Sequence, residues 1–395
     1  MEVLLATCTL ITLAAIGYLV VALWSVARLP LKHGEARDLP ALTVLKPLCG
    51  DEPSLDACLR SFCLQDYPAP LQIVFGLRDP ADPAYALARR LQREFPERDI
   101  EIVVDASVHG PNLKASNLVN MAGAARHDVF VVSDSDVLVA PDCLKMVAAG
   151  LHDPDIGAVT CLFRGLPRPG GNWVSQLGSL FLDAWFLPSA IVDATLSSVS
   201  VCYGPVTAIR REVIDHEGGF SQLTHVLADD TELGHITTRA GKRIALAPIA
   251  VDTLVSETRL SALFGHELRW ARTTRALRPS SFVASFVTHA LPIAILAFAL
   301  RPSLVNGLLM GTVAALRAVL LAVVEVRFGR ASTAVNPTPW MLAFREILYC
   351  GVWAIAFADR RITWRGRKLK ILPGARLAVD DAADALPVPD AERSS

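Results

Sequence analysis

Two short acidic clusters, Asp134-Ser135-Asp136 and Asp229-Asp230, followed by Arg269-Trp270, carry the clearest chemical signal in this sequence. Two aspartates at positions i and i+2 of extended backbone point to the same side, so both can approach one hard cation. Such a cation also takes oxygen ligands from a diphosphate and neutralises the charge of a departing phosphate group. We therefore interpret Asp134 and Asp136 as candidate metal ligands beside a phosphate.

The residues before the first cluster explain how it would be presented. Val129-Phe130-Val131-Val132 is an apolar run of β-branched and aromatic residues, which is typical of a buried strand. Its end would deliver the two carboxylates to the edge of a sheet. An isolated D-x-D also fits a simple polar turn after a strand, so the surrounding pattern must decide between the two interpretations.

Short β-like runs alternate with helical stretches over the central part of the chain. The predicted strands are Leu42–Leu45, Ile73–Leu77, Ile100–Val104 and Val129–Val132, and the predicted helices include Ala81–Phe95 and Leu113–Ala125. This alternation predicts an α/β fold with a mostly parallel sheet, whose ligand crevice lies beyond the carboxyl ends of the strands. Lys46, Asp79 and Asp134 each follow a predicted strand, so together they indicate a pocket at that edge.

The apolar excess of the chain lies at its two ends. The 395 residues are 52% hydrophobic, and Val3–Ala27 is long enough to cross a bilayer as a helix. A secretory signal peptide is the competing interpretation, but the start lacks a basic region and no clear cleavage site precedes Arg28. The positive charges of Arg28, Lys32, His33 and Arg37 place the following domain in the cytoplasm.

Three further apolar stretches follow position 280. Phe282–Leu300 and Leu304–Val324 predict a membrane hairpin, although Arg317 lies inside its second arm. The third stretch, Met341–Ala358, contains Arg345 and Glu346. Six basic residues follow it: Arg360, Arg361, Arg365, Arg367, Lys368 and Lys370. Because three crossings would put this basic segment on the wrong side, we interpret the third stretch as interfacial or re-entrant, or one of the spans as misjudged.

Other regions are less specific. Gln176–Val192 is either a core helix or a surface element that dips into the membrane and admits a lipid. A net charge of −1 without a long basic run argues against nucleic-acid binding, and the eight cysteines form no C-x-x-C pair. The expected organisation is an anchor at 1–28, a catalytic domain at 40–280, a membrane region at 281–372 and a disordered tail at 373–395.

A series of short motifs occurs in a fixed order along the chain. They are Lys46-Pro47-Leu48-x-Gly50, Gln65-x-Tyr67-Pro68, Asp79, Lys114-x-x-Asn117, Asp134-Ser135-Asp136, Gly218-Gly219-Phe220, Asp230 and Arg269-Trp270. In this order and spacing the chain resembles the ceramide glucosyltransferase family of inverting GT-A glycosyltransferases, over roughly Val3–Leu372. Within that group it is most similar to the bacterial hopanoid-associated glycosyltransferases, through the run from His266 to Thr273.

The resemblance implies a GT-A domain that faces the cytoplasm from a multi-pass protein of the bacterial inner membrane. It also implies a role for each matching residue. Lys46, Asp79, Lys114, Asp134, Arg269 and Trp270 would bind the nucleotide-sugar, Asp134 and Asp136 would hold the metal, and Asp230 would be the catalytic base. Asp229 is interpreted as a supporting or solvated group, and Trp270 could instead be a membrane-interface tryptophan.

Two positions depart from the family pattern. The closing motif of the family is R-x-x-R-W or Q-x-x-R-W, and its first position is His266 here, which puts that donor contact in doubt. Ceramide enzymes often carry a functional histidine in the region that matches Gln176–Val192, and this chain has none there. The second departure weakens the ceramide interpretation specifically.

The implied reaction is a single displacement at the anomeric carbon of a UDP-sugar, assisted by Mg²⁺ or Mn²⁺, with a lipid hydroxyl as nucleophile. N-acetylglucosamine transfer to a hopanoid polyol is the first expectation, and glucose transfer to ceramide is the second. A processive polysaccharide synthase shares the Q-x-x-R-W motif but needs more membrane spans than this sequence predicts. A non-catalytic membrane scaffold is the remaining alternative, and the intact set of acidic residues argues against it.

Overall fold

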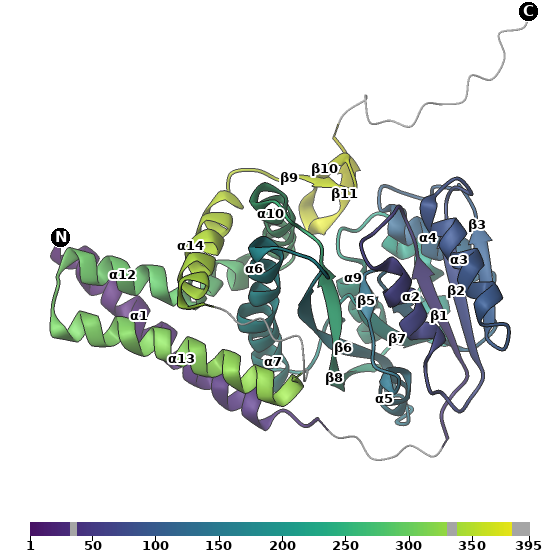
Figure 1. Cartoon of the computed structure of the whole chain (residues 1–395), viewed down its shortest axis with the longest axis horizontal. Helices are drawn as coiled ribbons and strands as arrows, with labels where there is room; N and C mark the ends of the chain where they lie inside the picture. The colour runs from purple at the N-terminus through teal and green to yellow at the C-terminus, as the bar shows by residue number, and fades with distance from the viewer. Residues whose placement is uncertain (32–37, 330–337, 381–395) are drawn as a thin grey trace, which may run out of the picture.

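An eight-stranded sheet forms the centre of the computed structural model, which describes residues 1–31, 38–329 and 338–380. The strand order is β3-β2-β1-β4-β7-β6-β8-β5. The strands are β1 (Leu42–Pro47), β2 (Leu71–Leu77), β3 (Asp99–Val104), β4 (Val129–Ser133), β5 (Val137–Leu138), β6 (Ile156–Pro167), β7 (Val206–Arg210) and β8 (Arg243–Val255). In Figure 1 the sheet occupies the right-hand part of the molecule.

Two of the eight strands, β7 and β5, run antiparallel to the other six. Strands β3, β2, β1 and β4 are parallel, β7 is antiparallel to both β4 and β6, and β6 runs parallel to β8. Strands β2, β1 and β4 are mostly apolar because both sheet faces are covered: Val44 packs into the core on one face and Leu45 into the core on the other. The predicted α/β fold with a mostly parallel sheet is confirmed.

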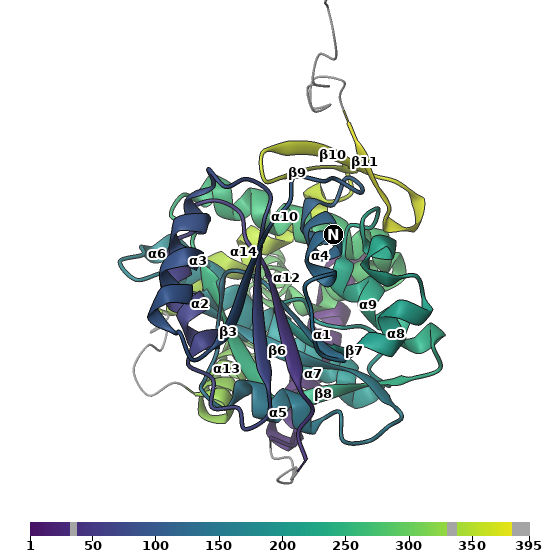
Figure 2. The same ribbon diagram turned by 90° about the vertical axis from the view of Figure 1, so that its right-hand side faces the viewer.

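Short helices cover both faces of the sheet. They are α2 (Leu55–Cys63), α3 (Pro83–Glu94), α4 (Leu113–Ala122), α5 (Cys143–Ala149), α8 (Arg211–His216), the 3₁₀ turn η2 (Gly219–Leu223) and α9 (Asp229–Arg239). Figure 2 shows α2 and α3 on one side of the strands and α4, α8 and α9 on the other. Helix α3 begins where its sequence indicates, because the Asp82 side chain accepts a hydrogen bond from the Ala84 N–H and Pro83 occupies the first turn.

Long apolar helices extend away from the sheet. Helices α1 (Glu2–Arg28) and α13 (Leu304–Phe328) are each long and apolar enough to cross a membrane. A third helical stretch, made of α11 (Pro279–Ala284), η3 (Ser285–Thr288) and α12 (Ala290–Leu300), is bent by 55° before α12. Helices α1, α12 and α13 pack side by side and project together from the molecule (Figure 1).

Other helices lie between this projecting group and the sheet. They are α6 (Trp173–Phe181), the π-helical turn η1 (Leu182–Phe186), α7 (Leu187–Leu196), α10 (Leu260–Leu277) and α14 (Pro339–Ile355). The stretch from Trp173 to Leu196 is also long and apolar enough to cross a membrane, but 72% of its apolar window is buried inside the protein. In Figure 1, α6, α10 and α14 run crosswise to α1 and α13.

The C-terminal segment corrects two predicted boundaries. Strands β9 (Arg361–Trp364), β10 (Arg367–Ile371) and β11 (Leu377–Val379) form a small antiparallel sheet, with η4 (Pro373–Ala375) between the last two. The end of the predicted membrane region thus forms strands, and the start of the predicted disordered tail is ordered. Ile362, Leu369 and Leu377 bury a core of their own, which a polar tail would lack. The rest of the predicted tail, with Lys32, His33 and Arg37, lies outside the described residues.

Candidate active site

Lys46 supports the turn that carries the first acidic cluster. Strand β4 ends at Ser133, and Asp134-Ser135-Asp136 forms a turn before β5. The Lys46 side chain is fully buried, and its Nζ donates to the Asp134 carbonyl at 2.7 Å and to Ser133 Oγ at 3.3 Å. Burial lowers the pKa of Lys46 to about 8. Lys46 thus contributes to this edge through the backbone of Asp134.

Lys114 joins the two acidic clusters. It lies in the first turn of α4, and its Nζ is 2.6 Å from Asp134 Oδ1 and 2.7 Å from Asp229 Oδ2. Burial alone would lower the pKa of Lys114, but the two carboxylates outweigh it and raise the pKa above its usual value. Asp229 is buried, so it is a partner in this bridge and not a solvated neighbour of Asp230.

Asp230 and Asp134 face a common point at the Gly204 backbone. A Cβ atom at position 204 would lie 3.2 Å from Asp230 Oδ2 and 3.7 Å from Asp134 Oδ2. The other oxygen of Asp230 accepts a hydrogen bond from the Thr231 N–H at 2.7 Å, in the first turn of α9. Any side chain at position 204 would therefore fill the space between the two carboxylates. The sequence analysis missed Gly204, because no local pattern marks it.

Two carboxyl groups of this site have strongly raised pKa values. Burial, with the charge of Asp229 added, raises the pKa of Asp230 to about 7, although Lys114 acts against the shift. Burial, with the charges of Asp134 and Glu52 added, raises the pKa of Asp136 to about 7. Such shifts are typical of sites where acidic groups are gathered for chemistry or cation binding.

Helix α10 brings the closing motif to the same group. Burial lowers the pKa of Arg269, and the nearby carboxylates of Asp134 and Glu257 oppose this shift. Arg269 therefore lies within electrostatic range of the acidic cluster. His266 Nδ1 lies 2.5 Å from Glu257 Oε1, and the His266 ring contacts Trp270 edge-on with 4.5 Å between ring centroids. In this chain His266, the first residue of the motif, thus interacts with Glu257 and packs against Trp270.

Asp79 lies at the same edge of the sheet but makes only local bonds there. It follows β2, its side chain is exposed, and its Oδ1 accepts a hydrogen bond from the Ala81 N–H at 2.8 Å. The structure thus brings Lys46, Lys114, Asp134, Asp230 and Arg269 together, whereas the hydrogen bond of Asp79 is to its own loop. A nucleotide contact by Asp79 stays a prediction.

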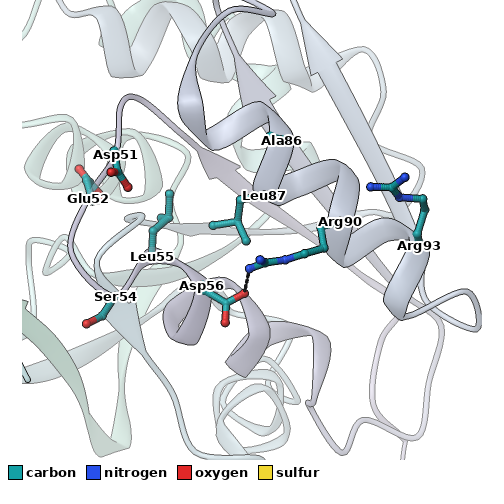
Figure 3. A pocket seen from close by; sticks show the side chains of 9 residues that line it. All are labelled: Asp51, Glu52, Ser54, Leu55, Asp56, Ala86, Leu87, Arg90 and Arg93. Atoms are coloured by element: carbon teal, nitrogen blue, oxygen red, sulfur yellow. Dashed lines mark hydrogen bonds and ion pairs between the residues drawn. The ribbon is translucent and has the colours of Figure 1, made fainter.

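A shallow pocket of about 510 Å³ lies beside this site, between the loop after β1 and helix α3. Figure 3 shows Asp51 and Glu52 at one end and the Arg90–Asp56 ion pair at the other. The acidic cluster does not line this pocket. Glu52 links the pocket to the acidic cluster, because it lines the pocket and its charge contributes to the raised pKa of Asp136.

The residues present fit a divalent metal that is bound partly by protein carboxylates and partly by phosphate oxygens. Asp134 and Asp136 offer hard oxygen atoms, and the raised pKa of Asp136 reflects a local excess of negative charge. Within residues 1–31, 38–329 and 338–380, no group of three or more acidic, histidine or cysteine side chains is placed to hold a metal alone. A metal here would therefore need oxygen atoms from a bound ligand.

Comparison with known proteins gives a family match over nearly the whole chain. The model of glycosyl transferase family 21 matches residues 7–377. Ceramide glucosyltransferase 1 of Caenorhabditis elegans is 23% identical over 395 residues, which cover 97% of this chain and 83% of that protein. An N-acetylglucosaminyltransferase of Rhizobium meliloti is 27% identical over 252 residues, which cover 61% of this chain and 57% of the relative.

A solved structure shares the fold. It is a mannosyltransferase from Pyrobaculum calidifontis in complex with GDP-Man and Mn²⁺, and it is 23% identical in sequence. The match has a TM-score of 0.51 and covers 82% of this chain and 98% of the other. At this identity the likeness shows the fold alone, which is the GT-A fold.

Proposed function

The chain belongs to glycosyl transferase family 21 and is a glycosyltransferase, and from this premise we propose that it moves a sugar from a UDP-sugar to the hydroxyl of a membrane lipid with inversion. The observation that carries the proposal is the Lys114 bridge between Asp134 and Asp229. It holds the neighbouring Asp230 so that Asp230 and Asp134 face the same point at Gly204. Sugar transfer needs a base and a phosphate-binding group close to the reacting carbon, and the short distance of both carboxylates from Gly204 supports this assignment.

Asp230 is the proposed general base. One of its oxygen atoms accepts the Thr231 N–H, which leaves Oδ2 directed at the Gly204 side. A pKa of about 7 suits a group that must take a proton from a hydroxyl near neutral pH. The deprotonated carboxylate would accept the hydroxyl proton as the lipid oxygen attacks the anomeric carbon, and UDP would leave from the opposite face.

The remaining residues would bind and orient the donor. Asp134 and Asp136 would hold Mg²⁺ or Mn²⁺, which supplies charge neutralisation on the diphosphate when bound. Arg269 would donate hydrogen bonds to the same diphosphate, because its planar group suits phosphate oxygens. Lys114 keeps Asp134 and Asp229 in place. Asp79 and Trp270 are proposed to contact the nucleotide and the sugar or acceptor.

The helices suit a protein that works at a membrane surface. We propose that α1, the bent stretch from α11 to α12, and α13 cross the bilayer, so that the catalytic domain and the small C-terminal sheet lie on the cytoplasmic side of the bacterial inner membrane. The ends of α1 and α13 support this, because the Arg327 side chain donates to the Leu29 carbonyl beside the sheet domain. Helices α6, α10 and α14 would then lie along the interface, where a lipid hydroxyl arrives.

Two substrate pairs fit this proposal. N-acetylglucosamine transfer to a hopanoid polyol is favoured, because this chain lacks a histidine between positions 176 and 192 and N-acetylglucosaminyltransferases are among its relatives. Glucose transfer to ceramide is the second candidate, and the family match and a full-length relative support it. Sugar selection depends on a few contacts to hydroxyl or acetamido groups, so an assay must choose between the pairs.

The assay uses membranes that carry the full chain, with an Asp230→Asn variant as control. Membranes are incubated with UDP-N-acetylglucosamine or UDP-glucose and with bacteriohopanetetrol or ceramide, and lipid products are identified by mass spectrometry. A hexosamine-bearing hopanoid made only by the unmodified protein is the expected result. Glucosylceramide would overturn the favoured substrate pair. A soluble polymer would favour a polysaccharide synthase, and no product from any pair would favour a scaffold.

A further inference from the structure

The β9–β10 hairpin lies against the candidate active site although it follows the last apolar helix. Its continuation pairs with the segment that leads to Asp229, because the Leu227 N–H donates to the Ala375 carbonyl at 3.0 Å and the Leu377 N–H to the His225 carbonyl at 2.8 Å. Figures 1 and 2 show this small sheet beside α10 and α4. The hairpin is thus attached to the backbone that precedes the proposed base.

The tip of the hairpin carries an arginine where the backbone favours another residue. Arg365 and Gly366 form the two-residue turn between β9 and β10, and both have positive φ angles, 50° and 77°. A turn of this kind prefers asparagine or aspartate before the glycine, because a long side chain resists the left-handed conformation. A strained arginine at this position therefore indicates a role for its side chain.

The Arg365 side chain points at the loop that borders the metal turn. Its Nη1 donates to the Cys49 carbonyl at 2.9 Å, and its Nη2 forms an ion pair with Glu52. The charge of Asp136 also acts on Arg365. The side chain is 46% exposed, and its contacts with Cys49 and Glu52 use only part of the five-donor guanidinium group. Arg365 is therefore anchored at the site and retains donors for a ligand.

Helix α10 holds the hairpin next to Arg269. The Arg269 guanidinium lies 5.8 Å from the centre of the Trp364 ring, directly before the turn. Arg272 donates to the Arg361 carbonyl, and Arg275 Nη2 donates to the Asp359 carbonyl at 3.0 Å. Three arginines of α10 thus contact the hairpin or its first residues. Arg269 of the closing motif and Arg365 of the hairpin tip are thus both within electrostatic range of Asp136.

We propose that the β9–β10 hairpin is part of the nucleotide-diphosphate site and that Arg365 binds the leaving diphosphate together with Arg269. Two arginines suit a diphosphate better than one, because each fork can bind oxygens of a different phosphate group. The proposal rests on the proposed function, since it needs a nucleoside diphosphate as the leaving group. It assigns to this site a segment that the sequence placed in the membrane region.

The test compares binding of UDP with binding of UMP to the purified full chain in detergent with Mn²⁺, measured by isothermal titration calorimetry. The variant Arg365→Asn removes the charge and places a favoured residue in the turn. The control Lys370→Gln removes a charge from an exposed side chain of the same hairpin. We expect Arg365→Asn to weaken UDP binding by about tenfold, as for loss of a charge-assisted hydrogen bond, and to leave UMP binding unchanged.

Each outcome bears on the proposal. A thermal unfolding midpoint of Arg365→Asn at or above that of the unmodified protein, with UDP binding alone reduced, supports it. Unchanged UDP binding would overturn it, and so would equal losses for UDP and UMP, which indicate a purely structural hairpin. If the unmodified protein binds no uridine nucleotide, the proposed function itself fails. An equal UDP loss in Lys370→Gln would assign the effect to general charge and also contradict the proposal.

Discussion

Buried charges occur in two regions of this protein, and they are arranged in opposite ways. At the edge of the sheet, Asp134 and Asp229 share Lys114, while Asp136 and Asp230 add further negative charge. Among the apolar helices, by contrast, Arg317 meets a single carboxylate, that of Glu346. Arg317 Nε lies 3.0 Å from Glu346 Oε1, and these side chains are 3% and 1% exposed.

The helical ion pair is satisfied within the protein. The Arg317 Nη1 and Nη2 atoms donate to the Ala184 and Thr288 carbonyls at 3.0 and 2.8 Å, and Glu346 Oε2 accepts from the Leu291 N–H at 2.6 Å. This pair therefore ties five elements together, α13, α14, η1, η3 and α12, and the charges of its two side chains are compensated within the protein. The sheet edge keeps surplus acidic groups with raised pKa values. The contrast indicates that the helical pair serves stability, whereas the sheet-edge group serves a charged ligand.

Replacing the proposed base, Asp230, should cause the largest loss of activity without a loss of stability. We expect Asp230→Asn to reduce sugar transfer by about 10²- to 10⁴-fold, because proton transfer by a positioned base contributes that much. The usual pKa of an aspartate is 3.8, and the pKa of Asp230 in the folded protein is about 7. Ionising Asp230 therefore lowers the stability of the fold as the pH rises from 3.8 through about 7. A neutral amide removes that cost, so the thermal midpoint at neutral pH should hold or rise. Turnover near the unmodified rate would refute the base assignment.

Breaking the Arg317–Glu346 pair should instead lower the stability of the protein. Arg317→Met leaves Glu346 buried without its partner, which should lower stability by about 3–5 kcal/mol. The double variant Arg317→Met with Glu346→Met should recover most of the loss, because an apolar pair needs no counter-charge. Thermal unfolding in detergent measures both, with Arg126→Met at an exposed ion pair as the control that should change little. A stable Arg317→Met variant would contradict the structural role.

The smallest expected effect is the pH dependence of sugar transfer, which should come from the acidic groups at the sheet edge alone. With a pKa of about 7, Asp230 is protonated on the acid side, so kcat/KM for transfer should fall by about tenfold for each pH unit well below 7. The residual rate of Asp230→Asn should lack this limb. A profile that stays flat down to pH 5 in the unmodified protein would show that no group with this pKa controls the reaction.

The first half of the sheet could be predicted from sequence, but the second half could not. Strands β1, β2 and β4 are mostly apolar, as a doubly covered sheet requires, and the edge strand β3 is apolar at Ile100, Ile102 and Val103. Strand β8 carries Pro248 in its interior, and proline argues against a central strand. The structure accommodates it with a shift in register opposite Thr160 and Leu162, where the β6–β8 pairing skips residues. That shift depends on the neighbouring strand, so the sequence of β8 alone does not indicate it.

The charged residues near the C-terminus show the same limit. Arg317 and Glu346 each argued against a membrane segment when they were counted separately, yet they neutralise each other between α13 and α14. The basic run from Arg360 to Lys370 suggested the flank of a membrane segment, and it instead forms the β9–β10 hairpin beside the acidic cluster. Pairing over such separations is decided by helix packing, which a linear pattern does not contain.

The sequence by itself determined the apolar segments, the parallel half of the sheet, and the positions of the acidic clusters, because these follow from local hydrophobic periodicity and from residue type. The tertiary structure decided which charges meet. Only the folded chain places Lys114 between Asp134 and Asp229, Gly204 between the two facing carboxylates, and Arg365 beside Glu52. These contacts join distant parts of the chain, so they exist only once the sheet, the helices and the C-terminal hairpin have packed together.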